Sequence, residues 1–459
     1  MPAVESYGVE PIPAELRTVG WRDLFAINFT FFLNPVMYLL GGFAVVDGGL
    51  PLWWAVAAMV VGQAIAYAAL VIVAEPGVDH GLQGQVAMRA TLGFWGARLL
   101  SSPYRVVAAT YWFAAQALTG GLGIQALVEA MTGTRLRLVP IALCLALFHA
   151  VLAVLGFDVM RWVLRVVLPV SLVFTGILVV LFLSADDPRF AAGRVFDSPD
   201  QRLTWVGFAT YVTVMSGATL TLVGNIADFC RYTPTRRDMR IGLTASALTA
   251  AAVTTFVGGY AAAATGATNP FVAVSQLTSS TILLLALMAA VVVQGIAANV
   301  TNVYTAGLSL VSSLPALGRI RATALVAAAA VTLSAFPDFV NHAQTWITHL
   351  GNVAAPLTGV VLAHYLIRER RRIDVGALFN PDGRYRYLKG INVEAILAVT
   401  AAVGIYYVFP AAWLKVVWGM GAGAGIYLAL VTVVRISNAR SSYRPHGGHP
   451  DASFRRRGG

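Results

Sequence analysis

The stretch NFTFFLNPVMYLLGG, residues 28–42, is apolar enough to lie in lipid, yet an Asn-Pro pair stands in its middle. A proline inside a helix removes a backbone donor and clashes with the preceding turn, at a cost of about 3 kcal/mol. In hydrocarbon the freed carbonyl groups find no water, so such a break persists only inside protein or beside a wet cavity. We therefore expect a helix break at Asn34 and Pro35, which by itself is equally compatible with a simple kink.

Composition assigns the whole chain to the membrane. Of the 459 residues, 58% are hydrophobic and 12% are charged, and the charged share is about half that of a soluble domain. Apolar runs long enough to cross a bilayer of ~30 Å predict an all-α polytopic protein. The twelve expected transmembrane helices are 23–46, 52–74, 106–131, 138–156, 159–183, 205–226, 241–266, 281–312, 322–336, 340–366, 391–409 and 412–434.

The basic residues predict the orientation. With a cytoplasmic N-terminus, 26 of the 32 Lys and Arg residues fall on the cytoplasmic face, as multi-pass proteins require. We expect a cell-membrane protein with both termini cytoplasmic, comprising an N-terminal segment (1–22), a helical domain (23–434) and a basic tail (435–459) predicted to be disordered.

The net charge of +11 indicates no nucleic-acid partner, because the positive charge is spread over loops without interleaved aromatic residues. Attraction to anionic lipid headgroups is a sufficient explanation. The two cysteines, Cys144 in a span and Cys230 near the cytoplasmic edge, are not expected to form a disulfide.

A second candidate break lies five spans after the first. The sixth span reads GFATYVTVMSGATLTLVGNIADF, residues 207–229, with Ser216 and Gly217 near its centre. Gly weakens a helix by about 1 kcal/mol relative to Ala, although a Ser-Gly pair also serves close packing. Breaks at matching positions favour a binding site at the membrane midplane and a 5 + 5 inverted repeat. The repeats would cover about 23–183 and 205–366, with extra helices over 391–434.

Polar side chains on two other spans are candidates to face that site. Trp112 and Gln116 are four residues apart, hence on one face of the third span, and they suit a flat, amide-rich ligand. Asn299 and Asn302 lie nearly on one face of the eighth span. Buried carboxamides need partners, so all four side chains bond either a ligand or neighbouring helices, and we favour the ligand.

No pattern for enzyme chemistry is present. The chain has no His-Glu-x-x-His motif, phosphate loop or Cys/His cluster, and we expect neither a metal site, a cofactor nor an intramembrane enzyme. A channel would need a continuous polar stripe, which the fourth, fifth and ninth spans do not offer. Few ionisable residues lie in the spans, mostly near their ends, which favours a neutral substrate: Glu129, His149, Asp228, His342, His349 and Glu394.

Four motifs together resemble the nucleobase–cation symporters, most closely the cytosine and purine permease branch, over about residues 5–435. They are YGVEPIPAELRT (7–18), YWFAAQ (111–116), NIADFCRYTP (225–234) and IAANVTNVYTAGLSL (296–310). The resemblance implies the leucine-transporter fold with discontinuous first and sixth helices, alternating access, and uptake of nucleobases or related rings driven by a cation.

The resemblance also implies roles for single residues. Trp112 stacks on the base, Gln116 bonds it, and Asn302 reads its edge, with Asn299 as support or alternative. Thr30 matches a small hydroxyl position in the first span. Asp228, with Arg231 close in sequence, is interpreted as structural or gating.

Two departures from the family pattern shape the prediction. Some relatives carry a Trp in the sixth span against the other face of the substrate, whereas this chain offers Ser216, Gly217 and Thr219 there. Sodium-coupled relatives place adjacent hydroxyls on the eighth span, whereas this chain has Ala297 and Ala298.

The sequence therefore predicts a symporter that imports a neutral nucleobase-like ring between spans one, three, six and eight. Proton coupling is favoured over sodium because the two alanines supply only backbone carbonyls, and the sequence does not identify the proton acceptor. Cytosine or a purine is the favoured substrate, and allantoin, hydantoin, uracil and a thiamine-like pyrimidine are the alternatives. An amino-acid transporter of the same fold is the alternative, but it would be expected to have a Gly-rich break in the first span.

Overall fold

A computed structural model describes residues 9–155, 157–197 and 201–442. The regular structure of the described residues is helical, with no strand among them and one isolated bridge between Leu388 and Ile391. The first eight residues of the predicted N-terminal segment and residues 443–459 of the predicted tail lie outside this part of the chain.

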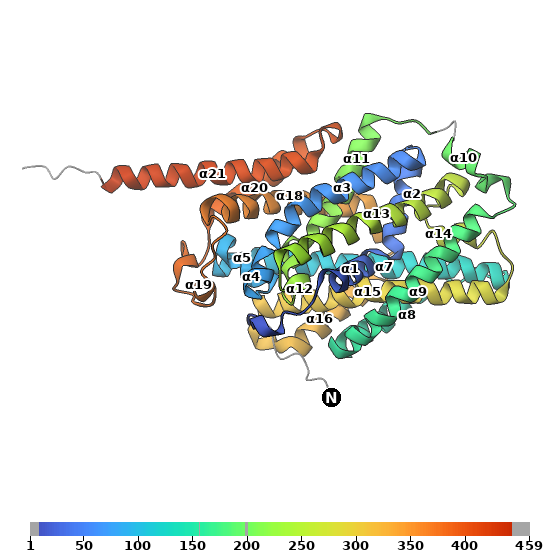
Figure 1. The fold of residues 1–459 in the computed structure, drawn as a ribbon, viewed down its shortest axis with the longest axis horizontal. Coiled ribbons are helices and arrows are strands. Elements are labelled where there is room, and N and C mark those ends of the chain that lie inside the picture. The colour runs from blue at the N-terminus through green and yellow to red at the C-terminus, as the bar shows by residue number, and fades with distance from the viewer. Residues whose placement is uncertain (1–8, 156, 198–200, 443–459) are drawn as a thin grey trace, which may run out of the picture.

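A helix lies at each of the twelve predicted spans (Figure 1). The spans correspond, in chain order, to α1 (Trp21–Phe32) with α2 (Pro35–Val46), α3 (Leu52–Val73), α7 (Ser102–Thr132), α8 (Leu138–Leu155), α9 (Phe157–Leu183), α11 (Trp205–Leu220), α13 (Arg236–Thr265), α15 (Thr281–Ser313), α16 (Gly318–Leu333), α18 (Ala343–Ala363), α20 (Val393–Val408) and α21 (Lys415–Ser442). By length and hydropathy alone, eight of the described helices qualify as spans, or nine with the bent pair α1 and α2. The count of twelve and the division into inverted repeats stay predictions.

The helices pack in two groups. In the first group α3 contacts α2, α11 and α13, and the second group consists of α7, α8, α15 and α16. The long helices α7 and α15 lie side by side along the molecule, while α18, α20 and α21 pack together at its edge (Figure 1). The broken first helix connects the groups, since α2 belongs to the first group and also contacts α7 of the second.

The predicted break at Asn34 and Pro35 is confirmed. Helices α1 and α2 meet there at 62°. The Asn34 carboxamide bonds both halves, because Nδ2 donates to Phe31 O at 2.7 Å and Oδ1 accepts from Met37 N at 3.1 Å. Pro35 occupies the first turn of α2, where its missing N–H leaves no bond unmade. Local side-chain bonds thus replace the backbone bonds that the break removes.

The predicted break at Ser216 and Gly217 is wrong. Helix α11 runs unbroken to Leu220, and the break falls in the 3₁₀ turn η4 (Thr221–Gly224) and at Asn225, before α12 (Ile226–Cys230). The Ser216 hydroxyl lies 2.6 Å from Val212 O and 3.0 Å from Gly62 O. Gly217 lies directly against Gly351 of α18. The Ser-Gly pair therefore serves close helix packing, the alternative open from sequence.

A short helix that the sequence did not predict supports the second break. Helix α5 (Gly84–Leu92) begins against η4, and a Cβ on Gly84 would lie 2.4 Å from Gly224 O. The Gly84 N–H donates to Asp228 Oδ1 at 2.7 Å, and Gln85 Nε2 donates to Gly224 O at 3.0 Å. These bonds occupy backbone groups that a helix end leaves open.

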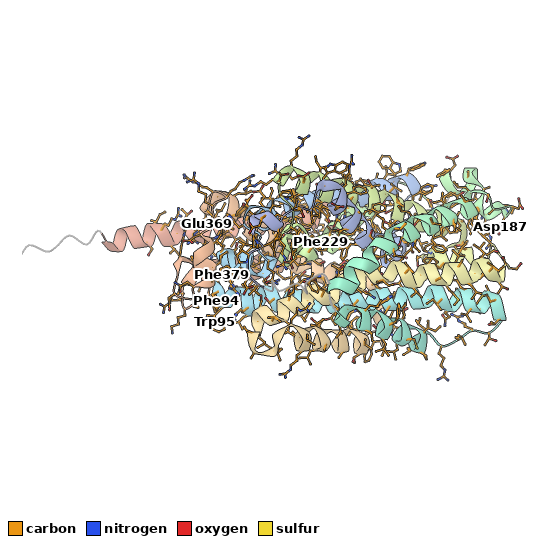
Figure 2. The ribbon with its side chains drawn as sticks, turned by 60° about the horizontal axis from the view of Figure 1, so that its bottom comes forward. Phe94, Trp95, Asp187, Phe229, Glu369 and Phe379 are labelled. Atoms are coloured by element: carbon orange, nitrogen blue, oxygen red, sulfur yellow. The ribbon has the colours of Figure 1, made fainter. Side chains whose placement is uncertain are left out.

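Two of the basic segments that were predicted to share one membrane face meet at one end of the molecule. Figure 2 shows Phe94, Trp95, Glu369 and Phe379 near this end and Asp187 at the opposite one. At the first end, the fully buried Glu75 carboxylate pairs with Arg236, Arg240 and Arg371 at 3.0, 2.7 and 3.1 Å. Which end faces the cytoplasm stays a prediction.

Candidate functional site

A cavity lies at the break of the first helix, between the two helix groups. Side chains from α1, α2, α7, α11, η4 and α15 line it. Every lining side chain is buried. The lining residues are Phe31, Phe32, Asn34, Met37, Trp112, Gln116, Ala218, Thr219, Thr221, Leu222, Ala298 and Asn302.

Helix α7 contributes an aromatic ring held in one orientation. The Trp112 indole N–H donates to Thr221 Oγ1 at 3.1 Å, across the two helix groups. The Tyr111 ring meets the indole edge-on at a centroid distance of 5.7 Å. Because the ring is fixed at its edge, its face is available for a flat ligand.

Gln116 lies one turn further along α7 and reaches the broken helix. Its Oε1 accepts the Val36 backbone N–H at 3.3 Å. A backbone N–H only donates, so the carboxamide atom that faces it is the oxygen. The amide nitrogen, which has no hydrogen-bond partner among the described residues, is left for the cavity.

Asn302 of α15 faces the cavity, whereas Asn299 does not. Asn302 Oδ1 accepts from Arg105 Nη2 at 3.1 Å. Asn299 Nδ2 lies 2.9 Å from His149 Nδ1, at the contact of α15 with α8. Of the two alternatives from sequence, the structure therefore places Asn302 in the cavity lining and Asn299 in helix packing.

Three other predicted site residues do not line the cavity. Thr30 donates to Ala26 O at 2.6 Å within its own helix, and Ser216 and Gly217 pack against neighbouring helices. Thr219 does line the cavity, and its hydroxyl donates to Gln63 Oε1 at 2.6 Å.

The two charged residues after the sixth span lie away from the cavity lining. Asp228 bonds the start of α5, and the Arg231 guanidinium lies over the Tyr232 ring at 5.5 Å. These contacts are compatible with the structural interpretation of the pair.

Sequence reasoning missed part of the site. From the sixth span the sequence predicted Ser216, Gly217 and Thr219 at the far side of the site, whereas Ala218, Thr219 and Leu222 line the cavity there. Arg105 is one of the 26 basic residues that the sequence assigns to the cytoplasmic face, yet its side chain is fully buried behind Asn302. Its spacing of 7 and 11 residues before Trp112 and Gln116 places it on the same helical face, which is the signal that could have found it.

Two broken helices around a small, buried, uncharged cavity define a membrane transporter. The profile of the family described as permeases for cytosine/purines, uracil, thiamine and allantoin matches residues 11–429, and the chain belongs to this family. Its characterised relatives are permeases, so the protein is a transporter and not an enzyme.

Two of these relatives show how far the similarity extends. The hydantoin permease of Microbacterium maritypicum is 23% identical over 86% of this chain and 82% of its own length. A purine-uracil permease of Arabidopsis thaliana is 25% identical over 88% of this chain and 71% of its own.

Solved structures establish the fold. The inward-facing conformation of Mhp1 superimposes with a TM-score of 0.81, covering 95% of both chains at 20% identity. A closed conformation of Mhp1 with bromovinylhydantoin bound gives a TM-score of 0.77, covering 95% of this chain and 97% of that one. The expected leucine-transporter type of fold is confirmed by this likeness.

Proposed function

We propose that the protein is a secondary active transporter that imports a neutral nucleobase-like ring by cation symport and alternating access. The observation that carries the proposal is the cavity at the first break, where the Trp112 ring and the carboxamides of Gln116 and Asn302 meet. A stacking face with amide donors and acceptors suits a flat, hydrogen-bonding ring. The hydantoin and purine-uracil permeases among its relatives transport compounds of this kind, as their names state.

The charge of the site supports a neutral substrate. Among the described residues that line the cavity, none is Asp, Glu, Lys, Arg or His. The buried Arg105 lies behind Asn302 and is not part of the lining, so a charged ligand would contact no counter-charge and would incur a large desolvation penalty. The same property weighs against the alternative substrate of this fold, a zwitterionic amino acid.

We further propose that the coupling cation is a proton. Sodium needs several oxygen ligands, and neither Ala297 nor Ala298, the residue of this pair that lines the cavity, supplies a side-chain oxygen. In this proposal the protein is a multi-pass protein of the cell membrane whose termini are both cytoplasmic, as the distribution of Lys and Arg predicts.

A thermal-shift screen of the purified protein tests the substrate class. A ligand that binds the folded state raises its stability by RT ln(1 + [L]/Kd). The panel contains purines, pyrimidines, hydantoin, allantoin and amino acids. We expect at least one nucleobase-like ring to raise the melting temperature; a shift produced by amino acids alone would replace the proposal by the alternative.

A further inference from the structure

We propose that Arg105 is a positioning residue that orients the Asn302 carboxamide, so that the cavity presents hydrogen-bond donors and selects rings with two carbonyl groups. Such rings include the cyclic ureides and imides, of which hydantoin and uracil are simple examples. Amino-substituted rings such as cytosine would be disfavoured. This inference rests on the proposed function and narrows its substrate class.

Arg105 is a buried cation held against the substrate side of α15. Its side chain is fully buried, and Nη2 lies 3.1 Å from Asn302 Oδ1 and 2.9 Å from Thr305 Oγ1. A guanidinium group carries five N–H donors, has no acceptor and stays protonated in proteins. The Asn302 atom that faces Arg105 is therefore the oxygen.

The orientation of Asn302 follows from this contact. Rotating the carboxamide by a half-turn would place its NH₂ group against a cation and remove a charge-assisted hydrogen bond, which is the stronger kind. Asn302 also lines the cavity, and within the described residues its Nδ2 has no hydrogen-bond partner. The NH₂ group is thus the atom that Asn302 offers to a ligand.

Gln116 is oriented in the same sense by a different donor. The Val36 backbone N–H occupies Gln116 Oε1, so the second carboxamide also offers its NH₂ group. The remaining polar side chains of the lining already have partners: the Trp112 indole N–H bonds Thr221, and both polar atoms of Asn34 bond the broken helix. Thr219 donates its proton to Gln63 and keeps an oxygen that can accept.

The polar side-chain groups left for a ligand are therefore two amide donors and one hydroxyl acceptor. A ring with the sequence carbonyl, N–H, carbonyl offers two acceptors and one donor, which matches this set. Cytosine replaces one of the two carbonyls by an amino group, whose N–H would meet another donor. A site whose polar groups are left unpaired by the wrong ligand discriminates strongly.

Equilibrium binding to the purified full-length protein tests the inference, with uracil, hydantoin and cytosine as competing probes. The parent is expected to bind uracil or hydantoin at least about tenfold more tightly than cytosine, the factor that one unpaired polar group produces. In Arg105→Gln the Asn302 carboxamide is free to rotate, so this ratio should fall towards one. Arg105→Lys, which still only donates, should keep most of the ratio.

Arg98→Gln is the matched control. It also removes an arginine near the start of α7, but Arg98 bonds Ser312 O and does not contact Asn302, so the ratio should be unchanged.

Asn302→Asp removes the donors and keeps the acceptors. This variant should weaken the binding of uracil and hydantoin but not that of cytosine. It tests whether Asn302 donates to the ligand even if Arg105→Gln does not fold.

The outcomes separate the two proposals. A parent protein that binds none of these rings nor any other nucleobase overturns the proposed function itself. A parent that binds cytosine as tightly as uracil and hydantoin overturns only the selectivity. A parent that discriminates, with an unchanged ratio in a folded Arg105→Gln variant, overturns the role of Arg105.

Discussion

Trp112 is the side chain whose removal should reveal stacking. Its indole is fixed by Thr221 and Tyr111 and lines the cavity. Trp112→Phe should retain part of the binding, and Trp112→Ala should lose about 1–3 kcal/mol, the range for stacking of a base on an aromatic ring. Isothermal titration with the ring that gives the largest thermal shift measures both.

Trp54→Ala is the control for this experiment, because Trp54 is 46% exposed on the outer surface of α3. Unchanged affinity in a folded Trp112→Ala variant would assign the indole to packing alone.

At the level of single residues, the sequence predicted the types of contact better than their directions. Helical spacing correctly brings Trp112 and Gln116 to one face. It does not separate Asn299 from Asn302, because their different partners, His149 on α8 and Arg105 on α7, come from other helices. Arg105 was missed for the same reason: a basic residue near a span edge is usually exposed, and only the packing of α7 on α15 buries it.

Among the elements, the contact between α5 and the second break should be sensitive to a single methyl group. A Cβ on Gly84 would lie 2.4 Å from Gly224 O, closer than atoms pack. Gly84→Ala should therefore lower the melting temperature and weaken ligand binding, because η4 carries the cavity residues Thr221 and Leu222. A thermal denaturation scan with and without ligand measures both effects.

Gly404→Ala in α20 is the matched control. Among the described residues, and apart from its chain neighbours and the backbone of its own helix, no atom lies within 4 Å of the position that the added methyl group would take. Ala is the better helix former by about 0.5–1 kcal/mol, so stability should stay equal or rise. A Gly84→Ala protein as stable as this control would show that α5 does not brace the break.

The two breaks differ in how visible they are in sequence. Pro35 disrupts its helix by itself, and Asn34 supplies the local cap, so the signal is complete within two residues. The second break depends on Gly224 meeting Gly84, residues 140 positions apart, whereas the more conspicuous Ser216 and Gly217 serve packing. Helix α5 has nine residues, three of them polar, and is too short for hydrophobic periodicity to identify.

At the scale of the whole molecule, transport measurements can identify the coupling cation. Uptake into proteoliposomes should follow an imposed pH gradient and continue without sodium, because α15 offers alanines in place of hydroxyls beside the first break. Each gradient is imposed separately at equal membrane potential. Uptake that stops without sodium and persists without a pH gradient would refute proton coupling.

The architecture as a whole was largely predictable, since a bilayer allows few solutions for a chain of this hydropathy. All twelve predicted spans coincide with helices, and segments such as those of Arg236 and Arg371 meet at one end around Glu75. The arrangement of the helices into two groups was not predicted, because composition and periodicity say nothing about which helices are neighbours.

The most direct test of the binding site compares two amides one turn apart on α15. Asn302→Ala should weaken ring binding roughly ten- to a hundredfold, the factor expected when a buried polar partner is lost. Asn299→Ala, which removes the contact with His149 outside the cavity lining, should leave the affinity close to that of the parent. Weakened binding in Asn299→Ala alone would move the site one turn along α15, and unchanged binding in both folded variants would contradict the proposed cavity.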